Sequence, residues 1–563
     1  MDVPLKPETP PRAGSHLRPL SILSAVALLP AFVLLVRGRD LEFASAALLQ
    51  SLLGWIALVC ALSRWRLLLW ISLPIVLLVP IEAKFIALYG YPSSRHAIAL
   101  VSETTAAEAT EFLSGLWPAL LSGLAVVSLI WIWLFRRWPD RRLASRPTQV
   151  AAIALMVAAS LGPELARVLP GTPLSIRQFT WANSFPLGVP YRVAGYLRAT
   201  VQVADARAAI ERFEWHATST ASDMDLVFVI GESSRPDHWG LAGYARDTTP
   251  RLSAMADVVF LADLVTPWTL TRYSVPTLLT RKPATLAGVL PEKSLIAAFR
   301  EAGFETHWFA NQDGMDEVSL HVREAEFVRS YNLAVGRGDI DAEFDGAMLP
   351  AIREALQRPA RRKLIVVHTK GSHWDYDRRY PPAFAHFKPD HVGNGESGKY
   401  DPANRDVLVN AYDNSIRYTD YFLAEIIAAL RSTGRPSALV YVSDHGQGLY
   451  DNGCTLFGQG NDLEASFRTA GLIWLSPSML QTHPSVDQTL RRNASRPILT
   501  AQTVINTIAD IGALSISDAK HSLISNSYLP QTRWVNTTAG GAVDFDQKGR
   551  VGSCRLVVDP ARN

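Results

Sequence analysis

The chain has 563 residues, which gives room for two or more domains. Hydrophobic residues make up 48% of it, a high share for a purely soluble enzyme, so membrane segments are expected. Lys and Arg number 55 against 52 Asp and Glu, and this balance argues against a nucleic-acid partner.

Residues 1–19 are polar and rich in proline, and we predict that they form a cytoplasmic N-terminus. No small-residue cleavage site follows the first apolar run, which predicts an anchor rather than a removed signal peptide. Five apolar runs then follow, each near the ~20 residues that cross a bilayer as a helix. They occupy residues 20–36, 41–62, 67–89, 116–135 and 148–163. Residues 20–163 are therefore predicted to form a five-span transmembrane domain.

Arginines give the orientation of these spans. Arg64 and Arg66 lie between the second and third spans, and five more arginines follow the fourth, between residues 136 and 146. By the positive-inside rule these loops are cytoplasmic, although Arg37 and Arg39 then lie on the opposite side. Five spans place everything after about residue 164 outside the cytoplasm. Near the end of the third span, Glu82 and Lys84 are expected to form a snorkelling pair.

Residues 164–223 are predicted to be a connector with amphipathic or interfacial helices, and 224–563 an α/β domain. Three apolar runs in this domain are typical of buried parallel strands. They are Leu226–Ile230, Lys363–Thr369 and Ser437–Ser443. Further strands are expected at 303–309 and 472–476, and helices at 294–302, 403–432 and 498–511. The tail after about residue 530 gives no clear pattern.

Each of the three apolar strands leads into acidic or imidazole side chains. Glu232 follows the first, His373 the second, and Asp444 with His445 the third. Ligands of open α/β sheets lie outside the carboxyl ends of the strands. Carboxylates and imidazole are ligands that zinc accepts, so this edge of the sheet is a candidate metal site.

Cysteines are few, and no thiolate metal site is present. Cys60 lies in an apolar run, so Cys454 and Cys554 are the only pair outside it that a disulfide could join. The sequence leaves this bond open. His368 lies inside a strand and is expected in the core, whereas His238 and His307 have no motif around them and are expected at the surface.

Six motifs in the domain resemble those of the inner-membrane phosphoethanolamine transferases, in the alkaline-phosphatase/sulfatase superfamily. The resemblance extends over the whole chain, including the five spans. The motifs are Gly231-Glu232-Ser233-Ser234-Arg235 with Gly243-Tyr244 and Thr249-Pro250; Thr271-Arg272-Tyr273-Ser274-Val275-Pro276; Gly303-Phe304 with Trp308 and Asn311-Gln312; His368-Thr369 with Gly371-Ser372-His373; Tyr412-Asp413-Asn414; and Ser443-Asp444-His445-Gly446.

The resemblance implies a bundle of five transmembrane helices and a periplasmic α/β domain of alkaline-phosphatase/sulfatase type, with a mainly parallel central sheet. It places the chain in the bacterial inner membrane. It also implies transfer of phosphoethanolamine from phosphatidylethanolamine, through a phosphothreonine at a zinc site, to a lipopolysaccharide (core or lipid A) or a periplasmic glycan.

Carried onto this sequence, the resemblance implies that Glu232, Asp444, His445 and Thr271 bind the zinc ion. Thr271 would be the nucleophile. His373 would bind the transferring phosphoryl group, a second metal or the acceptor. The residues by themselves do not select the nucleophile from the hydroxyls nearby, which are Ser233, Ser234, Thr269, Thr271 and Ser274.

One position departs from the family. Many lipid A phosphoethanolamine transferases have a further His in an Asn-Gly-x-x-Leu-His-Gly pattern, and here Phe457 takes its place. Phenylalanine cannot bind metal, which argues against a second zinc ion and favours an acceptor other than lipid A. Two alternatives stay open: a phosphoglycerol transferase acting from phosphatidylglycerol to a periplasmic glycan, and a degenerate scaffold, although the scaffold predicts a lost ligand and all four are present.

Overall fold

The structure is a computed structural model of the chain, and it describes most of the residues. Those described are 17–37, 41–89, 92–93, 98, 117–168, 181–286, 288–312, 316–331, 344–392, 401–537, 541–547 and 549–557. The loop at about 90–115 between the third and fourth spans falls almost entirely outside these ranges. The chain divides into two compact units, Met1–Arg198 and Ala199–Asn563.

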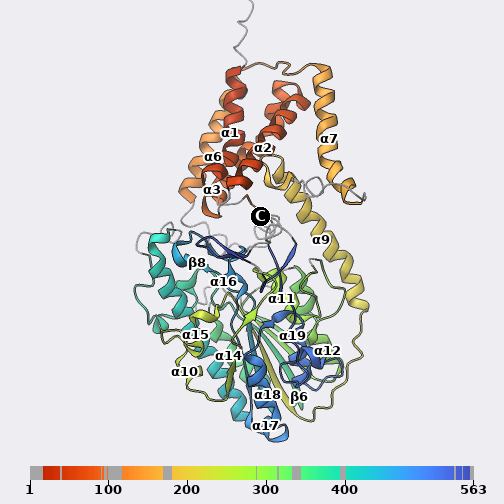
Figure 1. Ribbon diagram of the computed structural model, residues 1–563, viewed down its shortest axis with the longest axis vertical. Helices are drawn as coiled ribbons and strands as arrows, with labels where there is room; N and C mark the ends of the chain where they lie inside the picture. The colour runs from red at the N-terminus through yellow and green to blue at the C-terminus, as the bar shows by residue number, and fades with distance from the viewer. Residues whose placement is uncertain are drawn as a thin grey trace, which may run out of the picture. The chain divides into compact units, whose positions relative to one another are not determined.

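The first unit contains helices at all five predicted apolar runs (Figure 1). They are α1 (Leu17–Arg37), α2 (Leu41–Leu62), α3 (Trp65–Tyr89), α6 (Trp117–Arg137) and α7 (Arg146–Val168). Among the described residues, α1, α2, α3 and α6 are long and apolar enough to cross a membrane, and the apolar part of α7, Arg146–Leu161, is shorter. The predicted bundle of apolar N-terminal helices is confirmed, with four helices of spanning length and α7 shorter in its apolar part among the described residues.

A buried ion pair replaces the expected pairing of Glu82 with Lys84. Glu82 accepts a hydrogen bond from Arg192 at 2.8 Å, and both side chains are buried. The Ser93 N–H and hydroxyl donate to the same carboxylate. The expectation was wrong because Glu82 faces the protein, where Arg192 of α9 (Gly188–Arg212) reaches it, rather than the lipid.

The second unit is built on a seven-stranded sheet of order β2-β10-β7-β1-β6-β4-β5. The strands are β1 (Met224–Gly231), β2 (Val258–Phe260), β4 (Glu305–Ala310), β5 (Phe327–Ser330), β6 (Arg362–His368), β7 (Ser437–Ser443) and β10 (Gly471–Leu475). All neighbours pair in parallel except β10, which is antiparallel to β7 and β2. The prediction of a mainly parallel central sheet is confirmed.

Helices cover both faces of this sheet (Figure 1), so each face has its own core. Side chains alternate along β1: Leu226, Phe228 and Ile230 pack in one core, Val227 and Val229 in the other. The first core includes α11 (Thr271–Leu279), α12 (Leu295–Glu301) and α19 (Thr500–Ile511). The second includes α14 (Leu349–Gln357) and α15 (Arg405–Thr433). Because helices cover both faces, ligands can reach the sheet only at the ends of its strands, and in such sheets they bind at the carboxyl ends.

The tail forms short strands that the sequence did not predict. β12 (Trp534–Asn536) pairs with β13 (Ala542–Asp544), and β14 (Arg550–Val551) pairs with β15 (Leu556–Val557). A disulfide joins Cys454 to Cys554, so the bond that the sequence left open is present. It ties the tail to the segment that follows β7, together with a hydrogen bond from the Val557 N–H to the Asp462 carbonyl oxygen.

Candidate active site

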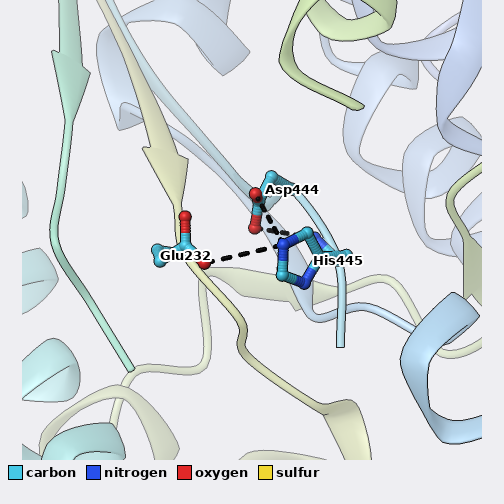
Figure 2. Close-up of side chains that lie close together, drawn as sticks. All are labelled: Glu232, Asp444 and His445. Atoms are coloured by element: carbon cyan, nitrogen blue, oxygen red, sulfur yellow. Dashed lines mark hydrogen bonds and ion pairs between the residues drawn. The ribbon is translucent and has the colours of Figure 1, made fainter. Parts of the chain in front are cut away.

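The three central strands β6, β1 and β7 bring their carboxyl ends together at one edge of the sheet. Glu232 follows β1, and Asp444 and His445 follow β7. Figure 2 shows these three side chains turned toward one another, and their candidate ligand atoms all lie within 4.8 Å of each other. All three are completely buried. Within the described ranges, this is the one group of at least three His, Cys, Asp or Glu side chains close enough to hold a metal ion.

A hydroxyl joins the group. Thr271 Oγ1 lies 3.0 Å from Glu232 Oε2 and 3.3 Å from His445 Nε2. His445 Nε2 lies 3.2 Å from Asp444 Oδ2 and 3.6 Å from Glu232 Oε1. A tetrahedral zinc ion with ligands at about 2.1 Å separates them by about 3.4 Å. The donor types and their spacing therefore fit a zinc ion.

Hydrogen bonds leave one atom of His445 and one atom of Asp444 facing the centre. The ring Nδ1 of His445 donates to the carbonyl oxygen of the next residue at 2.8 Å, so Nε2 is the ring nitrogen that faces the centre. The backbone N–H groups of Ser233 and His445 donate to Asp444 Oδ1, at 3.0 and 2.7 Å, so Oδ2 is left to face the centre. Glu232 accepts from Ser233 Oγ at 2.5 Å and from Gln312 Nε2 at 3.0 Å.

The negative charges of the Glu232 and Asp444 carboxylates repel each other. Burial and the neighbouring Glu232 carboxylate raise the pKa of Asp444 to about 7. Burial also acts against ionisation of Glu232, but the charges of His445 and His373 and the hydrogen bonds from Ser233 and Gln312 lower its pKa to about 2. A buried pair of acids of this kind gains most from a divalent cation, because the cation allows both to ionise.

Thr271 is the first residue of α11, and its side chain is 8% exposed. The N-terminus of a helix carries a partial positive charge and unsatisfied N–H groups, which favour negative charge beside it. Of the five hydroxyls that the sequence left open, Thr271 is the one with direct contacts to both Glu232 and His445 among the described residues. Ser274, one turn further on, is 3.5 Å from Asp444 Oδ2.

The turn after β1 leaves no room for larger residues. A Cβ added at Gly231 would lie 2.5 Å from the Tyr441 hydroxyl. Ser233 has a φ of 55°, in the left-handed region. The Tyr412 hydroxyl stabilises this conformation, because it donates to the Ser233 carbonyl oxygen and accepts from the Arg235 N–H. Tyr412 lies in one of the six sequence motifs, and the motif alone gave no indication of this role.

His373 lies in a turn that packs directly on Glu232. The Ser372 N–H donates to the Glu232 carbonyl oxygen at 3.0 Å, and a Cβ added at Gly371 would lie 3.0 Å from the Glu232 backbone. The charge of His373 contributes to the low pKa of Glu232. The structure thus places the turn that carries His373 against Glu232, one of the candidate metal ligands. The role of His373 in binding substrate stays a prediction.

Asp345 anchors that turn from the other side. Its buried carboxylate accepts from the N–H groups of Lys370 and Gly371, at 2.8 and 2.9 Å, and from Asn311 Nδ2 at 3.1 Å. Sequence analysis missed Asp345, which precedes α14 in a short 3-10 turn (Asp345–Met348) with no motif around it. Gln312 was part of a quoted motif, and its contact with Glu232 could have been suspected from that alone.

Two histidines lie elsewhere than expected. His238 is buried and its Nδ1 is 2.6 Å from Asp413 Oδ1, and His307 is buried with Nε2 2.8 Å from Glu305 Oε1. The surface prediction failed for both because each has an acid within reach that satisfies a buried ring. His368 lies in the core as expected, and burial lowers its pKa to about 4, which keeps it neutral.

Aromatic rings surround Phe457, which stands where many lipid A enzymes have a histidine. Its ring is 4.6 Å from that of Trp374 and 5.3 Å from that of Tyr450. Phe457 is 9% exposed, so it packs in a small apolar cluster beside the turn of His373. This environment offers no metal ligand at that position.

Comparison with known proteins gives a family and named relatives. The sulfatase family model matches residues 224–511. Kdo(2)-lipid A phosphoethanolamine 7''-transferase of Escherichia coli K12 is 29% identical over 277 residues, and the match spans about half of either chain, 48% of each. Phosphoethanolamine transferase EptC of the same strain is 26% identical over 499 residues, 82% of this chain and 83% of EptC.

Two solved structures are similar in fold. The zinc complex of the C-terminal periplasmic domain of EptC from Escherichia coli is 26% identical, with a TM-score of 0.51, covering 59% of this chain and 95% of that one. The integral membrane lipooligosaccharide phosphoethanolamine transferase A from Neisseria meningitidis is 20% identical, with a TM-score of 0.63, covering 90% and 98%. The second likeness shows that the apolar helices and the α/β unit together form a known fold.

Proposed function

The chain belongs to the sulfatase family, and from this premise we propose that it is a zinc-dependent phosphoethanolamine transferase of a bacterial inner membrane. Its donor is phosphatidylethanolamine. Its acceptor is a lipopolysaccharide, through core or lipid A, or a periplasmic glycan. The catalytic domain, residues 224–563, lies in the periplasm, after the transmembrane domain and the connector.

The observation that carries this proposal is the position of Thr271. Its buried hydroxyl lies 3.0 Å from Glu232 and 3.3 Å from His445, at the first residue of α11. A threonine hydroxyl is a weak nucleophile near neutral pH and must be activated. Contacts with a carboxylate and an imidazole, at a helix N-terminus, supply both a proton acceptor and a positive field.

The reaction has two steps in this proposal. Thr271 Oγ gives its proton to the Glu232 carboxylate beside it and forms a bond to the phosphorus of phosphatidylethanolamine. The bond from phosphorus to the diacylglycerol oxygen breaks, and diacylglycerol leaves after taking up a proton. A hydroxyl or phosphate oxygen of the acceptor then attacks the phosphothreonine and loses its own proton, and Thr271 Oγ takes its proton back as it is freed. His373, on the turn beside Glu232, donates the proton in the first step and accepts one in the second.

Glu232, Asp444, His445 and Thr271 would hold one zinc ion. When bound, zinc lowers the pKa of the threonine hydroxyl and neutralises charge that builds on the phosphoryl oxygens. The zinc complex of the similar EptC domain supports the choice of metal. Phe457 and its aromatic neighbours support a single ion and an acceptor other than lipid A.

The relatives support the transfer of phosphoethanolamine over other sulfatase-family reactions. The match to EptC covers 82% of this chain, so it extends beyond the residues that the family model matches. A membrane unit suits a reaction in which the donor and diacylglycerol both stay in the bilayer. All four proposed ligands are present, which counts against a degenerate scaffold.

The test is the intact mass of the full-length protein in detergent with zinc, after incubation with phosphatidylethanolamine or phosphatidylglycerol. We expect a phosphoethanolamine adduct on the wild-type protein and none on Thr271→Ala. Ser274→Ala is the matched control, because it removes a nearby hydroxyl of the same helix and should keep the adduct.

Other outcomes would change the assignment. A phosphoglycerol adduct would show that the donor is phosphatidylglycerol rather than phosphatidylethanolamine. An adduct that persists in Thr271→Ala and disappears in Ser274→Ala would show that Ser274, rather than Thr271, is the nucleophile. No adduct and no release of diacylglycerol from either lipid would contradict the transferase.

A further inference from the structure

A groove with a volume of about 540 Å³ lies in the membrane unit, between α1, α3 and the start of α6. Its walls are apolar. The residues that line them are Leu29, Phe32, Val33 and Val36 of α1, Pro80, Ala83 and Ala87 of α3, and Ala119 and Leu120 of α6. The volume is within the range of ~300–1,000 Å³ typical of small-molecule sites in proteins.

The groove follows from the residue pattern on one face of α1 and one face of α3. Its lining residues recur at helical spacing on both α1 and α3, so two stripes run side by side. The α3 stripe consists of Pro80, Ala83 and Ala87, whose small side chains leave the hollow. The larger side chains of α1 stay partly uncovered: Phe32 is 45% and Val36 79% exposed.

Two cations are among the residues that line this groove. Arg37 is the last residue of α1, and Lys84 lies on the lining stripe of α3. Neither forms an ion pair or hydrogen bond with another residue in the part of the chain that the structure describes. The acid nearest to Lys84 in the sequence, Glu82, is already paired with Arg192. Arg37 is also one of two arginines, with Arg39, that oppose the predicted orientation of the spans, so the positive-inside rule does not account for its position.

We propose that this groove binds a glycerophospholipid of the membrane, with an acyl chain along α1 and α3 and the phosphate between Arg37 and Lys84. From Leu29 to Arg37 the groove extends about 12 Å along α1, since a helix rises ~1.5 Å per residue. The apolar walls match an acyl chain, and the two cations match a phosphodiester. The site therefore recognises the phosphate, which phosphatidylethanolamine and phosphatidylglycerol share and diacylglycerol lacks. This proposal does not depend on the proposed transferase activity.

The first experiment needs no variant. The wild-type protein is reconstituted with phosphatidylethanolamine that carries a photoreactive group in the middle of one acyl chain, and the labelled peptides are identified by mass spectrometry. We expect label within residues 29–37 and 80–87, and competition by unlabelled phosphatidylethanolamine but not by diacylglycerol with the same chains. Label spread over all the apolar helices would overturn the proposal, because it would indicate ordinary lipid around the bundle.

The second experiment measures lipid retention by native mass spectrometry. We expect the wild-type protein to retain phosphatidylethanolamine and phosphatidylglycerol on the order of tenfold better than diacylglycerol, from two cations near a lipid phosphate. The double variant Arg37→Gln/Lys84→Gln should lose this preference, and Ala83→Trp, which fills the groove, should reduce retention of all three lipids. Arg136→Gln/Arg137→Gln is the matched control, with two cations removed from the last turn of α6.

An unchanged preference in Arg37→Gln/Lys84→Gln, or an equal loss in the Arg136→Gln/Arg137→Gln control, would overturn the proposal.

Discussion

Asp444 is a buried carboxylate with its Oδ2 atom 3.2 Å from His445 Nε2 and a second carboxylate, Glu232, in the same group. Because burial and Glu232 raise its pKa to about 7, Asp444 must release a proton near neutral pH before a cation can bind. Asp444 alone thus makes cation binding at the site depend on pH in a range where most aspartates are fully ionised.

We predict that zinc affinity falls as pH decreases below 7, by about fivefold between pH 7 and pH 6, since a proton with a pKa of about 7 competes with the ion. Chelator competition on the full-length protein between pH 6 and 9 measures this. The same shift acts on stability without metal: the folded protein holds a proton that the unfolded chain releases above about pH 4, so this contribution to stability is lost as pH rises toward 7. An affinity that stays flat from pH 6 to 8 would contradict the prediction.

Asp345 works through hydrogen bonds to the turn that carries His373. In Asp345→Asn, one of the two N–H groups of Lys370 and Gly371 loses its acceptor, which costs about 1–3 kcal/mol of unfolding free energy. We expect transfer activity to fall at least tenfold while zinc affinity changes less than threefold, because Ser233 and Gln312 still hold Glu232.

The matched control is Asp518→Asn. Asp518 also accepts from a backbone N–H, that of Lys520 at 2.9 Å, in an exposed turn (Ala519–His521). It should leave both activity and zinc affinity unchanged. If Asp345→Asn lowers zinc affinity and activity in parallel, its effect acts on the metal ligands rather than on the turn.

At the scale of elements, the apolar strands could be predicted and the short ones could not. β1, β6 and β7 are continuous apolar runs with polar ends, so both their position and the convergence of Glu232, Asp444 and His445 follow from pattern alone. The strands of the tail have two or three residues, too few for any period to appear. The approach of Thr271 to Glu232 depends on how α11 packs at the sheet edge, and residue spacing contains no information on that packing.

The disulfide links two such unpredicted elements to the site. Cys554 lies between β14 and β15, and the neighbouring Arg555 donates to Glu464 of α16 (Glu464–Phe467) at 2.7 Å. The Ser466 carbonyl oxygen of α16 accepts from the N–H of Gly446, directly after His445. The tail thereby supports the segment that carries two ligands.

We predict that Cys554→Ser lowers the unfolding free energy by about 2–5 kcal/mol, because a bond closing a loop of 100 residues restricts the unfolded chain strongly. Thermal unfolding of the full-length protein with and without reductant measures the loss, and reductant should have no further effect on the variant. Cys60→Ser, which removes the unpaired cysteine, is the control and should behave as wild type. Equal stability of Cys554→Ser and wild type would show that the tail contributes little.

The whole molecule consists of two units with separate cores. The membrane unit has its own buried cluster from α1, α2, α3 and α6, and the α/β unit has the two cores on either side of its sheet. The similar EptC domain was solved without its membrane part. The second unit thus contains all four proposed zinc ligands, and in our proposal the first unit gives access to the lipid.

We predict that residues 214–563 alone bind zinc with an affinity within threefold of the full chain. The same fragment should take phosphoethanolamine from a dispersed short-chain donor, yet act on phosphatidylethanolamine in vesicles at least a hundredfold more slowly, because it is no longer held at the bilayer. Diacylglycerol release from the two donor forms provides the measurement. Equal rates on vesicles for fragment and full chain would contradict this division of roles.

The order of synthesis limits when the bond between Cys454 and Cys554 can form. Because synthesis proceeds from the N-terminus, 100 further residues must be added after Cys454 before Cys554 is present. Disulfides persist only in oxidising compartments. A chain whose synthesis stops early, or whose second unit stays in the reducing cytoplasm, therefore lacks the support behind His445. In the proposed topology the bond therefore forms only after residue 554 has been synthesised and the second unit has left the reducing cytoplasm.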